Sequence, residues 1–160
     1  MLLPRAEDNF RLRRKTTPKG DVKMNVEFNN EIVDSEDIKD IIDKNTEFKV
    51  VKDMSKGSKR EDILAFNLSV EINTLNDLME DECDLSELTE DELFDEYLSL
   101  AEEIAMDIEE YVPEGAIMDI KAYKWEKSDN VIKLIIIIAT EDTTDLKLRD
   151  IMRKLITQVE

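Results

Sequence analysis

The sequence predicts an α+β fold: an antiparallel sheet of four to five strands, with one long acidic helix and a C-terminal helix packed on it. Two observations support this fold class. Strand-like segments occur in two pairs, each spaced as a β-hairpin, and a helix-like segment with one apolar stripe follows each pair. We expect residues 1–23 to form a basic extended arm, and residues 24–160 to form a single α+β domain.

The first half of the predicted domain ends in a hairpin. Residues 24–28 alternate apolar and polar side chains, which indicates a short strand. Ser35 is expected to cap a short helix that ends near Lys44. Residues 47–73 predict a hairpin, because apolar residues alternate regularly along its second strand. Its loop, residues 55–60, is expected to form a protruding positive tip. The short helix has a one-sided stripe of Ile38, Ile41 and Ile42.

The second half opens with an acidic segment. Residues 76–88 are interpreted as an acidic connection or a loose helix. Thr89 and Glu92 match a capping box, in which each side chain bonds the other's backbone N–H, so a helix should begin there and run to Tyr111. Pro113 and Gly115 should end it. Its apolar stripe is expected to be buried and consists of Leu93, Tyr97, Leu100, Ile104, Ile108 and Tyr111.

A second hairpin and a final helix complete the predicted domain. Residues 117–125 and 131–140 should pair around a turn at 128–130. Residues 134–138 are apolar at every position, which indicates a central strand covered on both faces or a strand whose outer face meets another subunit. The last helix should begin near residues 142–144 and pack through Leu148, Ile151, Met152, Leu155 and Val159.

Charge is strongly segregated along this chain of net charge −18. Residues 61–120 contain 21 Asp and Glu and no Lys or Arg, whereas the other hundred residues hold 19 acidic and 22 basic residues. A basic head and an acidic middle favour docking between oppositely charged surfaces. The expected partner-binding residues are Arg5, Arg11, Arg13, Arg14, Lys15 and Lys19 of the arm, and Glu90, Asp91, Asp95, Glu102, Glu103 and Glu109 of the body.

The residue types of this chain do not match the usual catalytic or metal-binding patterns. We therefore expect that the protein is not an enzyme and binds neither a cofactor nor a metal. The chain has no histidine, which removes the usual general base near neutral pH. Its one cysteine, Cys83, lies among acidic residues that raise a thiol pKa. The acidic residues at 77–92 lack the glycine of a calcium loop. Neighbouring pairs such as Glu102 and Glu103 point about 100° apart on a helix.

Other parts of the sequence bear on partners and location. Tyr123 and Trp125 are expected on one strand face, where packing under the final helix is favoured over stacking on nucleic-acid bases. Direct nucleic-acid binding is therefore expected only through the arm. Neither a signal-peptide core nor a membrane span is apparent, so we expect an intracellular, soluble protein of a host cytoplasm that does not bind membranes.

Two classes of function fit these observations. The first is a non-catalytic structural protein that docks through its arm and acidic body, as a homo-oligomer or in a larger complex. A small body with a terminal arm is also the architecture of phage connector, neck and tail proteins, so a virion component is one form of this hypothesis. The alternatives are an acidic inhibitor that mimics DNA, and a small chaperone or immunity-type binding module.

Overall fold

The computed structural model describes residues 25–28, 31–58, 62–79 and 85–159. Within these residues the chain is α+β, with four helices and two antiparallel sheets of two and four strands, which confirms the predicted class. The expected arm at 1–23 lies outside the described residues, as do Met24, Lys59, Arg60 and Cys83.

Both predicted hairpins are present in the four-stranded sheet. Its strand order is β3 (Lys49–Asp53), β4 (Ile63–Glu71), β6 (Val131–Thr140) and β5 (Ala116–Glu126), and every neighbouring pair is antiparallel. β3 with β4 and β5 with β6 are the two hairpins. The long pairing of β4 with β6 joins them, so the two most apolar strands occupy the centre of the sheet.

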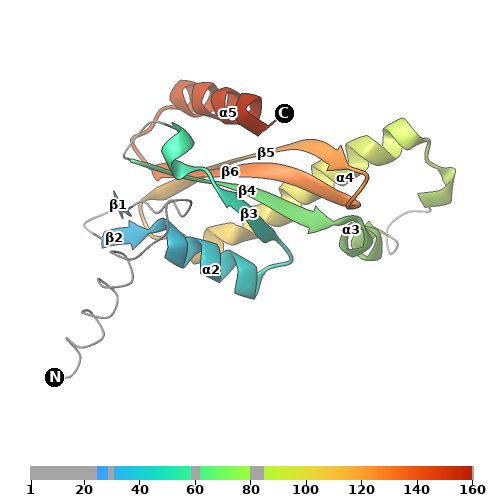
Figure 1. The fold of residues 1–160 in the computed structure, drawn as a ribbon, viewed down its shortest axis with the longest axis horizontal. Coiled ribbons are helices and arrows are strands. Elements are labelled where there is room, and N and C mark those ends of the chain that lie inside the picture. Colours follow the sequence, from blue (N-terminus) through green and yellow to red (C-terminus); the bar gives the residue numbers. More distant parts are fainter. Residues whose placement is uncertain (1–24, 29–30, 59–61, 80–84, 160) are drawn as a thin grey trace.

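Strand β6 is buried on both faces, which confirms the first of the two interpretations of residues 134–138. Leu134, Ile136 and Ile138 belong to a core shared with helices α2, α3 and α4. Ile135 and Ile137 belong to a second core, shared with α5 (Asp145–Val159). All five side chains are fully buried. Figure 1 shows α5 on one side of the sheet and the other helices on the opposite side.

A two-stranded sheet precedes the main sheet and includes a strand that the sequence did not reveal. β1 (Asn25–Phe28) pairs with β2 (Glu31–Asp34). β2 was not predicted from the sequence, because it has four residues and only its last two are buried.

Helix α2 (Ser35–Asn45) follows directly after β2. Its N-cap is Asp34 and not Ser35, because an oxygen of Asp34 accepts a hydrogen bond from the Glu36 backbone N–H at 2.9 Å.

Two connections differ from their predicted form. Ile72 was expected to end a strand, but it begins helix α3 (Ile72–Met79), which is followed by a 3₁₀ turn at Leu85–Glu87.

The loop after β3 was expected to protrude. Its described part is the 3₁₀ turn η1 (Ser55–Ser58), whose two serines are buried and whose Gly57 carbonyl accepts a hydrogen bond from Gln158 of α5 at 3.0 Å. These polar contacts hold the turn against the body.

The long acidic helix is shorter than predicted. The capping box at Thr89 and Glu92 is confirmed, and α4 spans Glu90–Ala105. A 3₁₀ segment, η3 (Met106–Tyr111), then replaces the expected helical turns. Tyr111 was assigned to the buried stripe, but it is 38 % exposed. The most buried residues of the two segments are Tyr97, Ala101, Ala105 and Ile108, while Leu93, Leu100 and Ile104 are partly buried at the flanks.

Tyr123 and Trp125 lie on opposite faces of β5, so their predicted placement on one face is wrong. The cause is a register shift between Ala122 and Lys124, which inserts one extra residue into the alternation. Trp125 packs edge-on against Tyr97 of α4, with ring centroids 5.1 Å apart. Tyr123 packs against the core of α5, and its hydroxyl donates to Asn67 at 3.0 Å.

The alanines of α4 generate a prediction about packing. Ala101 is fully buried, so Ala101→Leu should force a larger side chain into a filled core and cost about 1–3 kcal/mol. Ser99 is exposed on the same helix, and Ser99→Leu is the matched control. Urea unfolding of both variants is the measurement. Equal stability of the two would contradict the close packing of α4 on the sheet.

Candidate docking surfaces

The exposed sides of α4 and η3 form one acidic surface. Nine carboxylates belong to it, and all are exposed: Glu90, Asp91, Glu92, Asp95, Glu96, Glu103, Asp107, Glu109 and Glu110. They share a surface because the apolar stripe of α4 turns toward the sheet and leaves the polar positions on the opposite side of the helix. We call these nine residues the acidic surface.

Few cations neutralise the acidic surface within the described part of the chain. The ion pair found there joins Glu90 to Lys127 of the β5–β6 turn, whose ammonium also lies 5.0 Å from the Trp125 ring centroid. Asp91 and Asp95 are four residues apart on one helix face, as are Glu92 and Glu96. Like charges at this spacing destabilise a helix by about 0.2–0.5 kcal/mol per pair. These repulsions oppose the favourable interaction of Glu90, Asp91 and Glu92 with the positive N-terminal end of the helix dipole.

Glu102 differs from its acidic neighbours because it has a partner in the sheet. Its carboxylate accepts a hydrogen bond of 2.8 Å from the backbone N–H of Ala122, beside the register shift of β5. A register shift leaves backbone groups without their usual partner in the ladder. Glu102 supplies one and ties α4 to the edge of the sheet.

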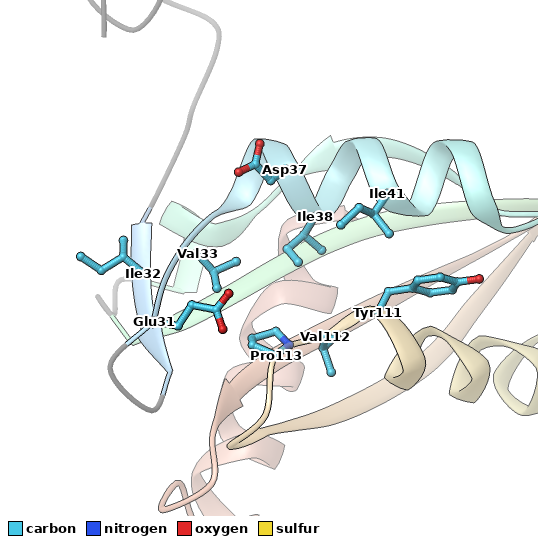
Figure 2. Close-up of a pocket in the computed structure, with 9 residues that line it drawn as sticks. All are labelled: Glu31, Ile32, Val33, Asp37, Ile38, Ile41, Tyr111, Val112 and Pro113. Atoms are coloured by element: carbon cyan, nitrogen blue, oxygen red, sulfur yellow. The ribbon is translucent and has the colours of Figure 1, made fainter. Parts of the chain in front are cut away.

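A groove lies next to the acidic surface, between α2 and the end of η3. Its lining comes from β2, α2 and the segment after η3, and comprises Glu31, Ile32, Val33, Asp37, Ile38, Ile41, Tyr111, Val112 and Pro113. Figure 2 shows the α2 isoleucines extending toward the segment at 111–113. Its volume is about 260 Å³. Seven of the nine lining residues are apolar, and Glu31 and Asp37 contribute carboxylates.

Tyr111 is the exposed large apolar side chain on the groove side, at 38 %. Ile32 is 71 % exposed, but Figure 2 shows its side chain on the side of β2 opposite Val33, away from Ile38 and Val112. The groove can accept apolar side chains, and the exposed carboxylates of η3 lie at its Tyr111 end.

The structure places the predicted site residues in three groups. Asp91, Asp95, Glu103 and Glu109 lie on the acidic surface and have no ion pair within the described residues, and Glu90 has its lysine partner. Glu102 is half-buried and bonded to the sheet. The arm residues Arg5, Arg11, Arg13, Arg14, Lys15 and Lys19 lie outside the described residues. The sequence analysis missed the groove, because its walls come from segments about 80 residues apart.

Asp119 lies on β5, on the face that carries α5. Burial raises the pKa of its carboxyl above the ordinary value of 3.8, a backbone hydrogen bond from Ile120 lowers it, and the nearby carboxylates of Asp145 and Glu102 raise it further. The ionised form is therefore less stable in the folded protein than in the unfolded chain.

The described residues show neither a metal site nor a membrane-spanning helix. Within the described residues, no group of three or more His, Cys, Asp or Glu side chains could hold a metal ion. In the same residues, no helix is long and apolar enough to cross a membrane. The chain matches no protein-family model, curated protein or solved structure. A functional proposal must therefore come from the surfaces themselves.

The Glu102 contact can be tested against its neighbour. Glu102→Ala should leave the Ala122 N–H without its acceptor and cost about 1–3 kcal/mol of stability. Glu103→Ala removes the same charge from an exposed position and should change stability by about 0.5 kcal/mol at most. Urea unfolding of the two variants decides. A similar small effect for both would mean that Glu102 does not support the sheet edge.

Asp119 makes stability depend on pH in a defined direction. Its folded pKa is raised, so wild-type stability should fall as pH rises from about 3.8 through the folded pKa and stay lowered above it. Asp119→Asn removes this loss, so the variant should resemble the wild type at pH 3 and be more stable at pH 7. Thermal unfolding across that range measures the difference. A difference that shrinks with rising pH would refute the assignment.

Proposed function

We propose that this protein is a non-catalytic assembly protein, in which the basic arm of one copy docks on the acidic surface and groove of the next. The single observation that carries this proposal is the acidic surface, with nine exposed carboxylates and one ion pair among the described residues. A cationic partner would relieve the repulsion between carboxylates four residues apart and bind the surface through charge complementarity.

The arm has the composition that the groove requires. In residues 10–15 the sequence is Phe-Arg-Leu-Arg-Arg-Lys. On an extended backbone, Phe10 and Leu12 would lie on one side, and Arg11 and Arg13 on the other. The apolar side could fill the groove between α2 and η3, while the arginines reach the carboxylates around it. This pairing favours the arm over a partner that is only charged.

An arm that binds a second copy creates a heterologous contact. The donor and acceptor surfaces differ, so each copy can give one arm and receive another. Such contacts close into rings or continue into filaments. The proposed role is therefore a structural component of a larger protein complex, of which a phage virion connector, neck or tail is one example. No cofactor takes part in this proposal.

An acidic inhibitor that mimics DNA is the second candidate. The line of carboxylates along α4 and η3 favours it, because a basic groove of a nucleic-acid enzyme could bind such a line. It leaves the apolar groove and the basic arm without a role. The assembly proposal uses all three features.

Neutralising the arm tests the proposal directly. The full-length variant Arg11→Gln, Arg13→Gln, Arg14→Gln, Lys15→Gln should self-associate at least about tenfold more weakly than the wild type. Raising salt from about 0.1 M to about 1 M should weaken wild-type association too, because the screening length falls from about 10 Å to about 3 Å. Sedimentation velocity over a concentration series gives both results. Unchanged association of the arm variant would refute arm docking.

The groove has a matched control on another part of the molecule. Tyr111→Glu places a charge at the groove, whereas Leu146→Glu places one on α5, and both side chains are exposed, at 38 % and 67 %. Neither change should unfold the protein. Tyr111→Glu alone should weaken self-association. Equal behaviour of the two variants would move the docking site away from the groove.

A further inference from the structure

The α5 side of the main sheet carries two rows of lysines that the strand register brings together. Lys49 of β3 pairs with Ser69, Ser69 pairs with Lys133 of β6, and Lys133 pairs with Lys124 of β5. These four residues form one row across four strands that are spaced about 4.8 Å apart. The sequence separates its three lysines by as many as 84 positions.

A second row lies beside the first on the same face. Lys52 pairs with Asn67, Asn67 with Ile135, and Ile135 with Lys121. The two rows are two residues apart on β4 and β6, which is about 6.8 Å, while register shifts put Lys49 and Lys52, and likewise Lys121 and Lys124, three residues apart. We call the five lysines of the two rows the lysine face; they are Lys49, Lys52, Lys121, Lys124 and Lys133.

Helix α5 covers only the other end of this side of the sheet. Its core extends over Ile63, Ala65, Ile137 and Ala139 and reaches Ile135. Figure 1 shows the strands continuing past α5 toward the β5–β6 turn. Four lysines of the lysine face are exposed, and Lys133 is half-buried. The lysine side chains are therefore exposed or half-buried, while Asn67 and Ile135, which lie between Lys52 and Lys121 in the second row, are buried.

Positive charge on the lysine face is incompletely balanced. Lys124 forms an ion pair with Glu126 at 2.9 Å, and the other four lysines have none within the described residues. Lys133 and Lys124 are direct cross-strand neighbours, and like charges in that position are destabilising. The next row contributes the carboxylates of Glu71 and Glu126, which leaves the five lysines in excess.

The aromatic residues of β5 make a nucleic-acid partner a poor fit. Trp125 is on the opposite face, against Tyr97. The Tyr123 hydroxyl is bonded to Asn67, and its ring packs toward α5. Base stacking needs a free aromatic face, and a chain of net charge −18 repels phosphates. Carboxylates on a protein surface are therefore a better anionic partner for the lysine face than the phosphates of a nucleic acid.

We propose that the lysine face binds the acidic surface of a second copy at Asp91, Asp95 and Glu103 of α4. Asp91 and Asp95 are four residues apart on α4, a rise of about 6 Å, which is close to the spacing of about 6.8 Å between the lysine rows on β4 and β6; Glu103 lies about 12 Å beyond Asp95. The two surfaces lie on opposite sides of the same sheet, so one copy cannot join its own. Each contact leaves a lysine face and an acidic surface available for further copies.

This contact rests on the proposed assembly function for its acidic surface, and a docked arm would compete with the lysine face for the same carboxylates. It is therefore tested in the full-length arm variant described above, where arm docking is already removed. Two further triple variants are made in that background: Lys121→Gln, Lys124→Gln, Lys133→Gln, and separately Asp91→Asn, Asp95→Asn, Glu103→Gln.

Mixing the two triple variants tests the head-to-tail direction. Each alone lacks one partner surface, so each should sediment as a monomer at concentrations where the arm variant associates. An equimolar mixture retains one intact lysine face and one intact acidic surface. It should therefore form a heterodimer and stop there. The control Lys44→Gln, Lys147→Gln, Lys154→Gln removes three exposed positive charges elsewhere and should associate like the arm variant.

Three results would overturn the contact. They are full association of either triple variant alone, a mixture that remains monomeric, and binding of a single-stranded oligonucleotide that the lysine triple variant loses. The arm proposal fails separately, when neutralising the arm leaves wild-type association unchanged. A heterodimer from the mixture would still support the lysine face in that case.

Discussion

The burial of β6 on both faces is the constraint on which the rest of the structure depends. Five consecutive apolar side chains alternate between the two sides of the sheet, so neither side can face water along that segment. Helices α2, α3 and α4 cover one side, and α5 covers the other. With helices on both sides, β6 and β4 lie at the centre of the sheet, and β3 and β5 lie at its edges.

This arrangement also separates the charges. The acidic block of the sequence includes α3, α4 and η3, which lie on the α4 side of the sheet. The lysines of β3, β5 and β6 project to the α5 side, because the register places them in line with Asn67 and Ser69. A sheet between two such surfaces keeps most of their opposite charges apart, although Lys127 reaches Glu90 and Lys124 pairs with Glu126. The remaining charges could be neutralised by another molecule, which is the physical basis of the association that we propose.

Local patterns predicted much of this fold, while features set by pairing were missed. Alternation identified both hairpins, and Thr89 with Glu92 identified the start of α4. The extra residue at Tyr123 could not be predicted from the sequence, because a register shift depends on the partner strand and not on the composition of β5. For the same reason the rows of lysines could not be foreseen. The acidic residues were predicted as partner-binding, but sequence could not reveal that Glu102 bonds the sheet.

Both charged surfaces place like charges close together. Carboxylates four residues apart repel one another along α4, and Lys124 repels Lys133 across the strands. Burial of β6 in two cores can offset these small costs, since each fully buried branched side chain contributes about 1.5–3 kcal/mol. The cores therefore allow the fold to keep like charges together on each surface. Association of the two surfaces would relieve both repulsions at once, so the same residues that repel one another in the monomer would strengthen the assembly.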